Sequence, residues 1–122
     1  MSENTTYAGG CHCGKVRFEV TADVSTVVSC NCSICQRTGA LMAFVPASQF
    51  TLKAGAALTD YQLGKKHVHH QFCSSCGVRS FGHGTGPNSQ EMYMINVRCL
   101  DDIDLDLDLD PLAIKKLDGK SL

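Results

Sequence analysis

The stretch Cys11-His12-Cys13-Gly14-Lys15-Val16-Arg17-Phe18-Glu19-Val20-Thr21 places a pair of cysteines directly before a segment of alternating polarity. In an extended backbone the side chains at positions i and i+2 share a face, so Cys11 and Cys13 can bind one ion together. Val16, Phe18 and Val20 alternate with polar residues, which predicts a half-buried strand. The stretch therefore predicts a β domain whose first metal ligands lie at the entrance of a strand.

Two further cysteine clusters extend this pattern: Cys30-Asn31-Cys32-Ser33-Ile34-Cys35 and Cys73-Ser74-Ser75-Cys76-Gly77. A closed structural zinc site uses four ligands, whereas a catalytic zinc site keeps an open coordination position. The seven clustered cysteines therefore predict one closed site of four thiolates and one open site of three. Spacing alone leaves undecided whether Cys73 and Cys76, or two of the cysteines at 30, 32 and 35, complete the site begun by the first pair.

A disulfide framework is the alternative explanation for an even number of cysteines. Cysteines one or two residues apart are poor disulfide partners for each other, but they converge readily on one ion. Residues 1–7 have no basic head and no apolar segment, so no signal peptide is expected. We therefore expect metal sites, and a protein of the reducing cytoplasm.

The bulk composition predicts a single globular domain that spans residues 1–122, since domains of this length are common. No apolar run approaches the roughly 20 residues that cross a bilayer. The formal net charge is −1, and the sequence shows no cluster of lysines and arginines large enough to predict the basic face of a nucleic-acid-binding protein. Neither a nucleic-acid partner nor a membrane partner is expected, and the oligomeric state is left open.

Most other periodic segments are typical of short strands, which makes the predicted fold class mainly β. We expect strands at 26–29, 41–45, 50–52, 58–61, 68–72 and 92–97. The apolar segment 41–45, ended by Pro46, suits a strand buried on both faces. A short helix is expected near 34–38, and turn-forming residues predict a loop at 82–89. The aspartate-rich segment 101–110 is expected to be a surface loop or extended edge at the start of an acidic C-terminal tail, 101–122.

Three blocks of this sequence resemble the signature blocks of the glutathione-dependent formaldehyde-activating enzyme family. They are Gly10-Cys11-His12-Cys13-Gly14-Lys15-Val16, Cys30-Asn31-Cys32-Ser33-Ile34-Cys35-Gln36-Arg37-Thr38-Gly39 and Phe72-Cys73-Ser74-Ser75-Cys76-Gly77. The segment Asn96-Val97-Arg98-Cys99-Leu100-Asp101 is similar to the last core strand of that family. The resemblance covers a core of about 9–104.

The resemblance implies an Mss4-like β-tent of short antiparallel strands organised around zinc. It also implies two zinc ions per chain, of which the second is more labile. Cys11, Cys13, Cys73 and Cys76 would match the structural zinc. The second zinc, with an exchangeable fourth ligand, would match Cys30, Cys32 and Cys35.

The activity that the resemblance implies is condensation of glutathione with formaldehyde to S-hydroxymethylglutathione, a carbon–sulfur lyase reaction. Bound zinc lowers the pKa of a coordinated thiol, so the three-cysteine site could hold glutathione, or another thiol, as a thiolate next to a small aldehyde. Cys30, Cys32 and Cys35 would then act in catalysis through the second zinc. The alternative is a non-catalytic, zinc-ribbon-like module that binds a protein or chromatin partner, and a thiol redox enzyme using Cys99 is a third class.

Several residues outside the clusters have more ordinary interpretations. Cys99 is expected to be a buried apolar residue, because free cysteine is commonly found in cores. His67, His69 and His70 are expected to be solvated or locally hydrogen-bonded. Arg37 could pair with a glutathione carboxylate or offset the thiolate charge, and both roles stay open.

Overall fold

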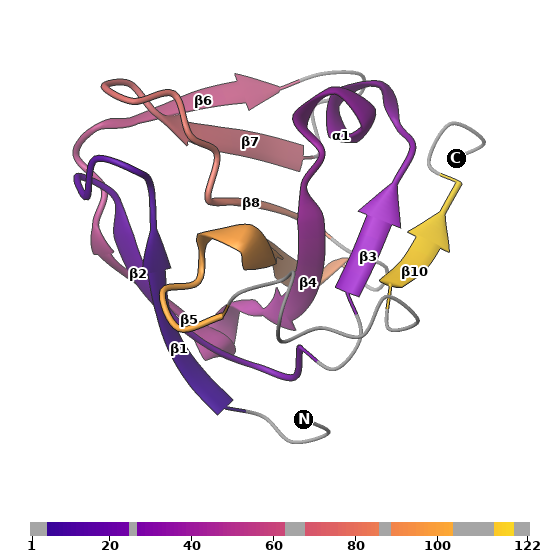
Figure 1. Cartoon of the computed structure of the whole chain (residues 1–122). Coiled ribbons are helices and arrows are strands. Elements are labelled where there is room, and N and C mark those ends of the chain that lie inside the picture. Colours follow the sequence, from indigo (N-terminus) through magenta and orange to yellow (C-terminus); the bar gives the residue numbers. More distant parts are fainter. Residues whose placement is uncertain (1–4, 25–26, 63–67, 86–88, 104–113, 119–122) are drawn as a thin grey trace.

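The computed structural model describes residues 5–24, 27–62, 68–85, 89–103 and 114–118. The chain forms a small β-tent of two sheets (Figure 1). The smaller sheet has the strand order β1-β2-β5, with β1 at Thr5–Gly10, β2 at Arg17–Ala22 and β5 at Phe50–Ala54. The mainly β fold class is confirmed.

The larger sheet has the strand order β10-β3-β4-β9-β8-β7-β6. Its strands are β3 (Val27–Cys30), β4 (Leu41–Pro46), β6 (Leu58–Gln62), β7 (Val68–Cys73), β8 (Phe81–Thr85), β9 (Glu91–Asn96) and β10 (Ile114–Leu117). In the described ranges the α-helical content is one short helix, α1, at Ser33–Thr38, as predicted. Two 3₁₀ turns, η1 (Ala47–Gln49) and η3 (Val97–Cys99), follow β4 and β9.

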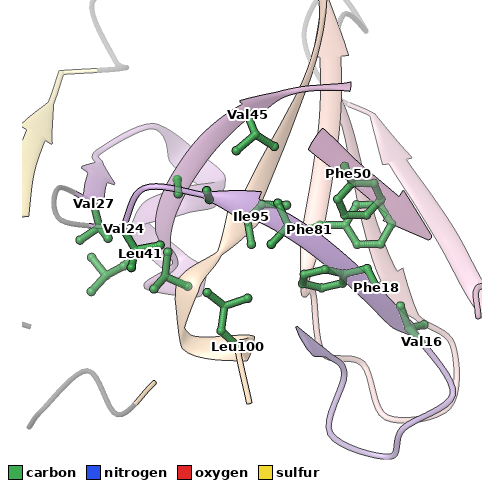
Figure 2. Close-up of a cluster of buried hydrophobic side chains, with 14 of the residues drawn as sticks. Val16, Phe18, Val24, Val27, Leu41, Val45, Phe50, Phe81, Ile95 and Leu100 are labelled. Carbon is green, nitrogen blue, oxygen red and sulfur yellow. The ribbon is translucent and has the colours of Figure 1, made fainter. Parts of the chain in front are cut away.

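The core lies where the two sheets face each other, and it combines aliphatic side chains with a group of phenylalanine rings (Figure 2). Phe18 of β2 packs against Phe50 of β5 and Phe81 of β8, with ring centroids 5.3 and 5.8 Å apart. Phe50 also stacks on Tyr93 of β9 at 4.2 Å. These contacts join the smaller sheet to the middle of the larger one, which fixes the relative position of the strands that carry the cysteines.

The alternation at the start of the chain predicted its strand correctly. Val16, Phe18 and Val20 are each at most 1% exposed, and they point into the core. Strand β4 matches the expected segment, but Phe44 is 43% exposed, so the strand is not buried on both faces along its whole length.

The strand assignment differs from the expectation in three places. The segment 82–89 is not a loop throughout, because β8 begins at Phe81 and continues to Thr85. Pairing with β7 on one side and β9 on the other stabilises the glycine-rich segment as a strand. Strands β1 and β10 were not expected. Strand β10 pairs with β3 in parallel, whereas the other strand pairs among the described residues are antiparallel. Of the aspartate-rich segment, 104–110 lies outside the described residues, and Asp101 forms an ion pair with Arg17.

Candidate metal centres

Cys11, Cys13, Cys73 and Cys76 form a four-cysteine cluster in which all Sγ atoms lie within 4.8 Å of one another. The Sγ atom of Cys13 lies 3.7 Å from that of Cys11 and 3.6 Å from that of Cys73. Residues 60 positions apart in the sequence thus meet at one point. The structure brings together the cysteines that the family resemblance assigns to the closed site.

Two similar backbone turns carry these cysteines. The amide of Cys11 donates to the carbonyl of Val16, and the amide of Cys73 donates to the carbonyl of Val78, both at 3.1 Å. Gly77 has a φ of 79°, a left-handed conformation that favours glycine. Each turn directs its two sulfurs to the same side, which explains why C-x-C and C-x-x-C-G spacings suffice to build the cluster.

Electrostatics in the four-cysteine cluster favour some thiolates over others. Burial raises the pKa of Cys11, but the Val16 amide, which lies 3.3 Å from its Sγ, and the neighbouring thiols outweigh burial and lower it. The Val78 amide is the main group that lowers the pKa of Cys76 to about 6. The Lys15 amide lowers the pKa of Cys13, yet burial and the neighbouring thiols raise it to about 11. Four crowded sulfur donors, some of them easily ionised, fit a soft divalent cation such as Zn²⁺.

Cys30, Cys32 and Cys35 form a separate three-cysteine cluster, also with all Sγ atoms within 4.8 Å. Cys30 ends β3, Cys32 is the N-cap residue of α1, and Cys35 lies within the helix. The amide of Cys32 donates to the Sγ of Cys30 at 3.4 Å. In the part of the chain that the structure describes, the cluster has no fourth cysteine, histidine or carboxylate.

The first turn of α1 favours the thiolate form of Cys32. Burial raises its pKa, but the amides of Cys35 and Ile34 and the two neighbouring thiols lower it below the ordinary value. Burial and, to a lesser degree, the neighbouring thiols together raise the pKa of Cys35 to about 12, against an opposing effect of Arg79. The three sulfurs therefore need a cation before all of them can ionise, and they fit an open zinc site.

Arg79 is the positive charge that acts on this cluster from the sheet side. Its Nη1 donates to Nδ1 of His70 at 2.8 Å, and its Nη2 lies 3.8 Å from Sδ of Met42, which packs against Cys35. Burial, followed by repulsion from Arg79, lowers the pKa of His70 to about 4, so His70 is neutral and can accept this hydrogen bond. Sequence reasoning did not identify Arg79, although its position three residues after Cys76 was a usable signal.

The remaining candidates have local partners. The Nδ1 of His69 lies 2.8 Å from Asp60, and His70 contacts Arg79, so local hydrogen bonding is confirmed for both, whereas His67 lies outside the described residues. Arg37 donates to the carbonyl of Ser33 at 2.9 Å, within its own helix. Cys99 lies outside both clusters, and desolvation raises its pKa to about 11, but its burial is intermediate, so the expectation of a fully buried core residue was wrong.

A cavity of about 410 Å³ lies beside the three-cysteine cluster, between α1 and β10. Its lining includes Cys30 and Cys35, so a small molecule in this cavity would reach two of the three thiols. A second cavity of about 290 Å³ lies on the other side of α1, against Tyr61 of β6. Among the described residues no helix is both long enough and apolar enough to cross a membrane.

Two comparisons with known proteins agree with this architecture. The family model described as glutathione-dependent formaldehyde-activating enzyme matches residues 6–114. A crystal structure of a Rhodobacter sphaeroides protein is similar, with 35% sequence identity and a TM-score of 0.72. The similarity covers 83% of this chain and 94% of that one.

Proposed function

Because this chain belongs to the glutathione-dependent formaldehyde-activating enzyme family, we propose that it is a zinc enzyme that joins a thiol to a small aldehyde. The thiol is glutathione or a similar molecule, and the aldehyde is formaldehyde or a related small electrophile. The reaction would be of the carbon–sulfur lyase type, with S-hydroxymethylglutathione as the product of the named pair. A single domain in the reducing cytoplasm suits this function, because the eight cysteines are free thiols.

In this proposal the two cysteine clusters have different tasks. Cys11, Cys13, Cys73 and Cys76 hold a structural zinc, since four thiols from two distant turns close the coordination sphere. Cys30, Cys32 and Cys35 hold the second zinc with one position left for an exchangeable ligand. When bound there, zinc would lower the pKa of a coordinated substrate thiol, so that the thiol is held as a thiolate near neutral pH.

The reaction forms one carbon–sulfur bond and needs no oxidant. The thiol sulfur attacks the carbonyl carbon, the π electrons move to the oxygen, and the proton lost by the thiol is finally carried by that oxygen. Thiols and formaldehyde also combine in solution, so the chain contributes mainly by bringing the two reactants together. Met42 and Ala40, both buried beside Cys35, exclude water from the inner side of the cluster.

Arg79 supports the same function through charge. Three thiolates around one Zn²⁺ carry a net charge of −1, and a fourth sulfur would make the site more negative. The guanidinium acts on Cys35 in the direction that stabilises its thiolate. It would therefore offset part of the added charge when a substrate thiolate binds.

The observation that carries the proposal is the three-cysteine cluster beside a cavity, with no fourth protein ligand among the described residues. A pure binding module has no need of an incomplete metal site. The test is the rate of the glutathione–formaldehyde reaction with zinc-loaded protein, compared between wild type, Cys32→Ala and Cys99→Ala. We expect Cys32→Ala to lose about one zinc per chain and the acceleration, while Cys99→Ala keeps both.

Wild-type protein that holds two zinc ions but does not accelerate this reaction, or that of other small thiols and aldehydes, would refute the enzymatic proposal. The alternative of a binding module for a protein or chromatin partner would then take its place. A single zinc after reconstitution of the wild type would refute the two-site arrangement itself.

A further inference from the structure

Strand β10 forms a wall of the cavity beside the three-cysteine cluster. In Figure 1 this strand lies next to β3. It pairs with β3 in parallel, with Leu117 opposite Cys30. The amide of Asn31 donates to the carbonyl of Leu117 at 3.1 Å, and Nδ2 of Asn31 donates to Asp118 at 2.9 Å. The end of β10 is thus attached to the loop that joins Cys30 to Cys32, and its position relative to the thiols is fixed.

The cavity combines thiols on one side with opposite charges on the other. Its volume of about 410 Å³ lies within the range of about 300 to 1,000 Å³ that small-molecule sites occupy. The β10 wall contributes Lys116, Leu117 and Asp118, whereas β3 and α1 contribute Cys30, Cys35 and Gln36. A cation and an anion two residues apart are complementary to a group that itself carries both charges.

We propose that this cavity binds the non-reacting end of the thiol substrate, and that Lys116 and Asp118 select thiols with an amino-acid head, an ammonium and a carboxylate on one carbon. Lys116 donates to the carboxylate. Asp118 accepts from the ammonium while it keeps its hydrogen bond from Asn31, because a carboxylate can accept several hydrogen bonds. This proposal rests on the proposed function, since it assumes that the sulfur of the same molecule binds at the three-cysteine site.

The position of the wall in the sequence makes this selectivity a property of this chain. The family model matches residues 6–114, so Lys116 and Asp118 lie beyond the matched region. The family match therefore accounts for the thiol site, whereas the β10 wall accounts for which thiol is preferred.

Lys115 provides a matched control for the test. It is exposed and adjacent to Lys116, but it is not among the residues that line the cavity. The variants to compare are Lys116→Gln, Asp118→Asn and Lys115→Gln. Asp118→Asn keeps an oxygen for the bond from Asn31, so it changes the charge with little change in the loop.

Binding is measured on protein loaded with Co²⁺, from the sulfur-to-cobalt charge-transfer absorption as thiol is added. Two thiols are titrated: glutathione, which has the amino-acid head, and 2-mercaptoethanol, which has no charged group. We expect Lys116→Gln and Asp118→Asn each to raise the Kd for glutathione about fivefold, as for an exposed charge pair, and to leave that for 2-mercaptoethanol unchanged. Lys115→Gln should bind both thiols like the wild type.

The outcomes separate the two proposals. Unchanged glutathione affinity in both Lys116→Gln and Asp118→Asn, or an equal loss with Lys115→Gln, would overturn the selectivity proposal and leave the thiol site standing. An equal loss for both thiols would also overturn it, because a general disturbance of the metal site would then be the cause. Absence of any spectral response to either thiol in the wild type would overturn the proposed function, and the selectivity proposal with it.

Discussion

Replacing Cys73 by serine should destabilise the domain far more than the same change at Cys32. The four-cysteine cluster joins Cys13 to Cys73 across 60 residues of chain. Cross-linking positions this far apart removes about 4 kcal/mol of chain entropy from the unfolded state, if the relation established for disulfides also describes a metal clip. Small domains have total stabilities of about 5 to 15 kcal/mol, so this is a large share.

Loss of an ion from the three-cysteine cluster should destabilise the domain less, because the loop that this ion closes is short. Cys30 and Cys35 belong to one short segment that α1 already orders, so an ion there closes only a small loop. We therefore expect Cys73→Ser to lower the Tm by roughly 10 to 20 °C, or to give insoluble protein, and Cys32→Ser to lower it by only a few degrees. Cys73→Ala tests whether burial of the serine hydroxyl, rather than loss of the ion, causes the change.

The measurements are thermal unfolding followed by circular dichroism and zinc per chain, on freshly reconstituted protein. Equal Tm values for Cys73→Ser and Cys32→Ser would refute the argument from chain separation. A soluble Cys73→Ser variant with the wild-type Tm would show that the four-cysteine cluster does not hold a structural ion.

Three further predictions follow from the geometry of the two clusters. A chromophoric zinc chelator should remove about one zinc per chain rapidly and the other only when the protein unfolds, because three ligands hold an ion less tightly than four. Release of both ions in one phase, with the fold intact, would contradict this prediction. Arg79→Met should weaken Co²⁺ and thiol binding at the three-cysteine site about tenfold, and Arg79→Lys should restore part of the loss. Equal binding by the wild type, Arg79→Met and Arg79→Lys would exclude a charge effect of Arg79. Burial lowers the pKa of His70 from 6.5 to about 4, so its contribution to stability is complete above about pH 6.5 and falls as the pH drops toward 4. His70→Gln should therefore make the free energy of unfolding in urea less dependent on pH in this range, with zinc content checked at each pH. An unchanged pH dependence would contradict the assignment.

The sequence predicted those features that depend on local patterns. Val16, Phe18 and Val20 show a period of two, and the strand they predict faces the core. The cysteine spacings predicted two groups of ligands, because each turn directs neighbouring sulfurs to one side without help from the rest of the fold. The short helix after Cys32 followed from the same local reasoning.

Features that depend on distant partners were missed. Gly82 and Gly84 favour a loop in isolation, but hydrogen bonds from β7 and β9 hold them in a strand. A Cβ atom at position 82 would lie 2.7 Å from the carbonyl oxygen of His69, so glycine there permits close approach of two strands rather than a turn. The parallel strand β10 and the contact between Arg79 and His70 also require knowledge of which segments meet, and no local pattern contains it.

The position of Arg79 between the two clusters has a consequence for the order in which they take up metal. Arg79 follows the turn of Cys73 and Cys76 by three residues, and its guanidinium reaches Met42 beside the other cluster. We expect an ion in the four-cysteine cluster to fix this turn and, with it, the segment that carries the guanidinium. Metal uptake should therefore be ordered: the first ion fills the four-cysteine cluster and completes the electrostatic surroundings of the second site. A cell short of zinc would accumulate folded protein that holds one ion, ready to become active when a second arrives.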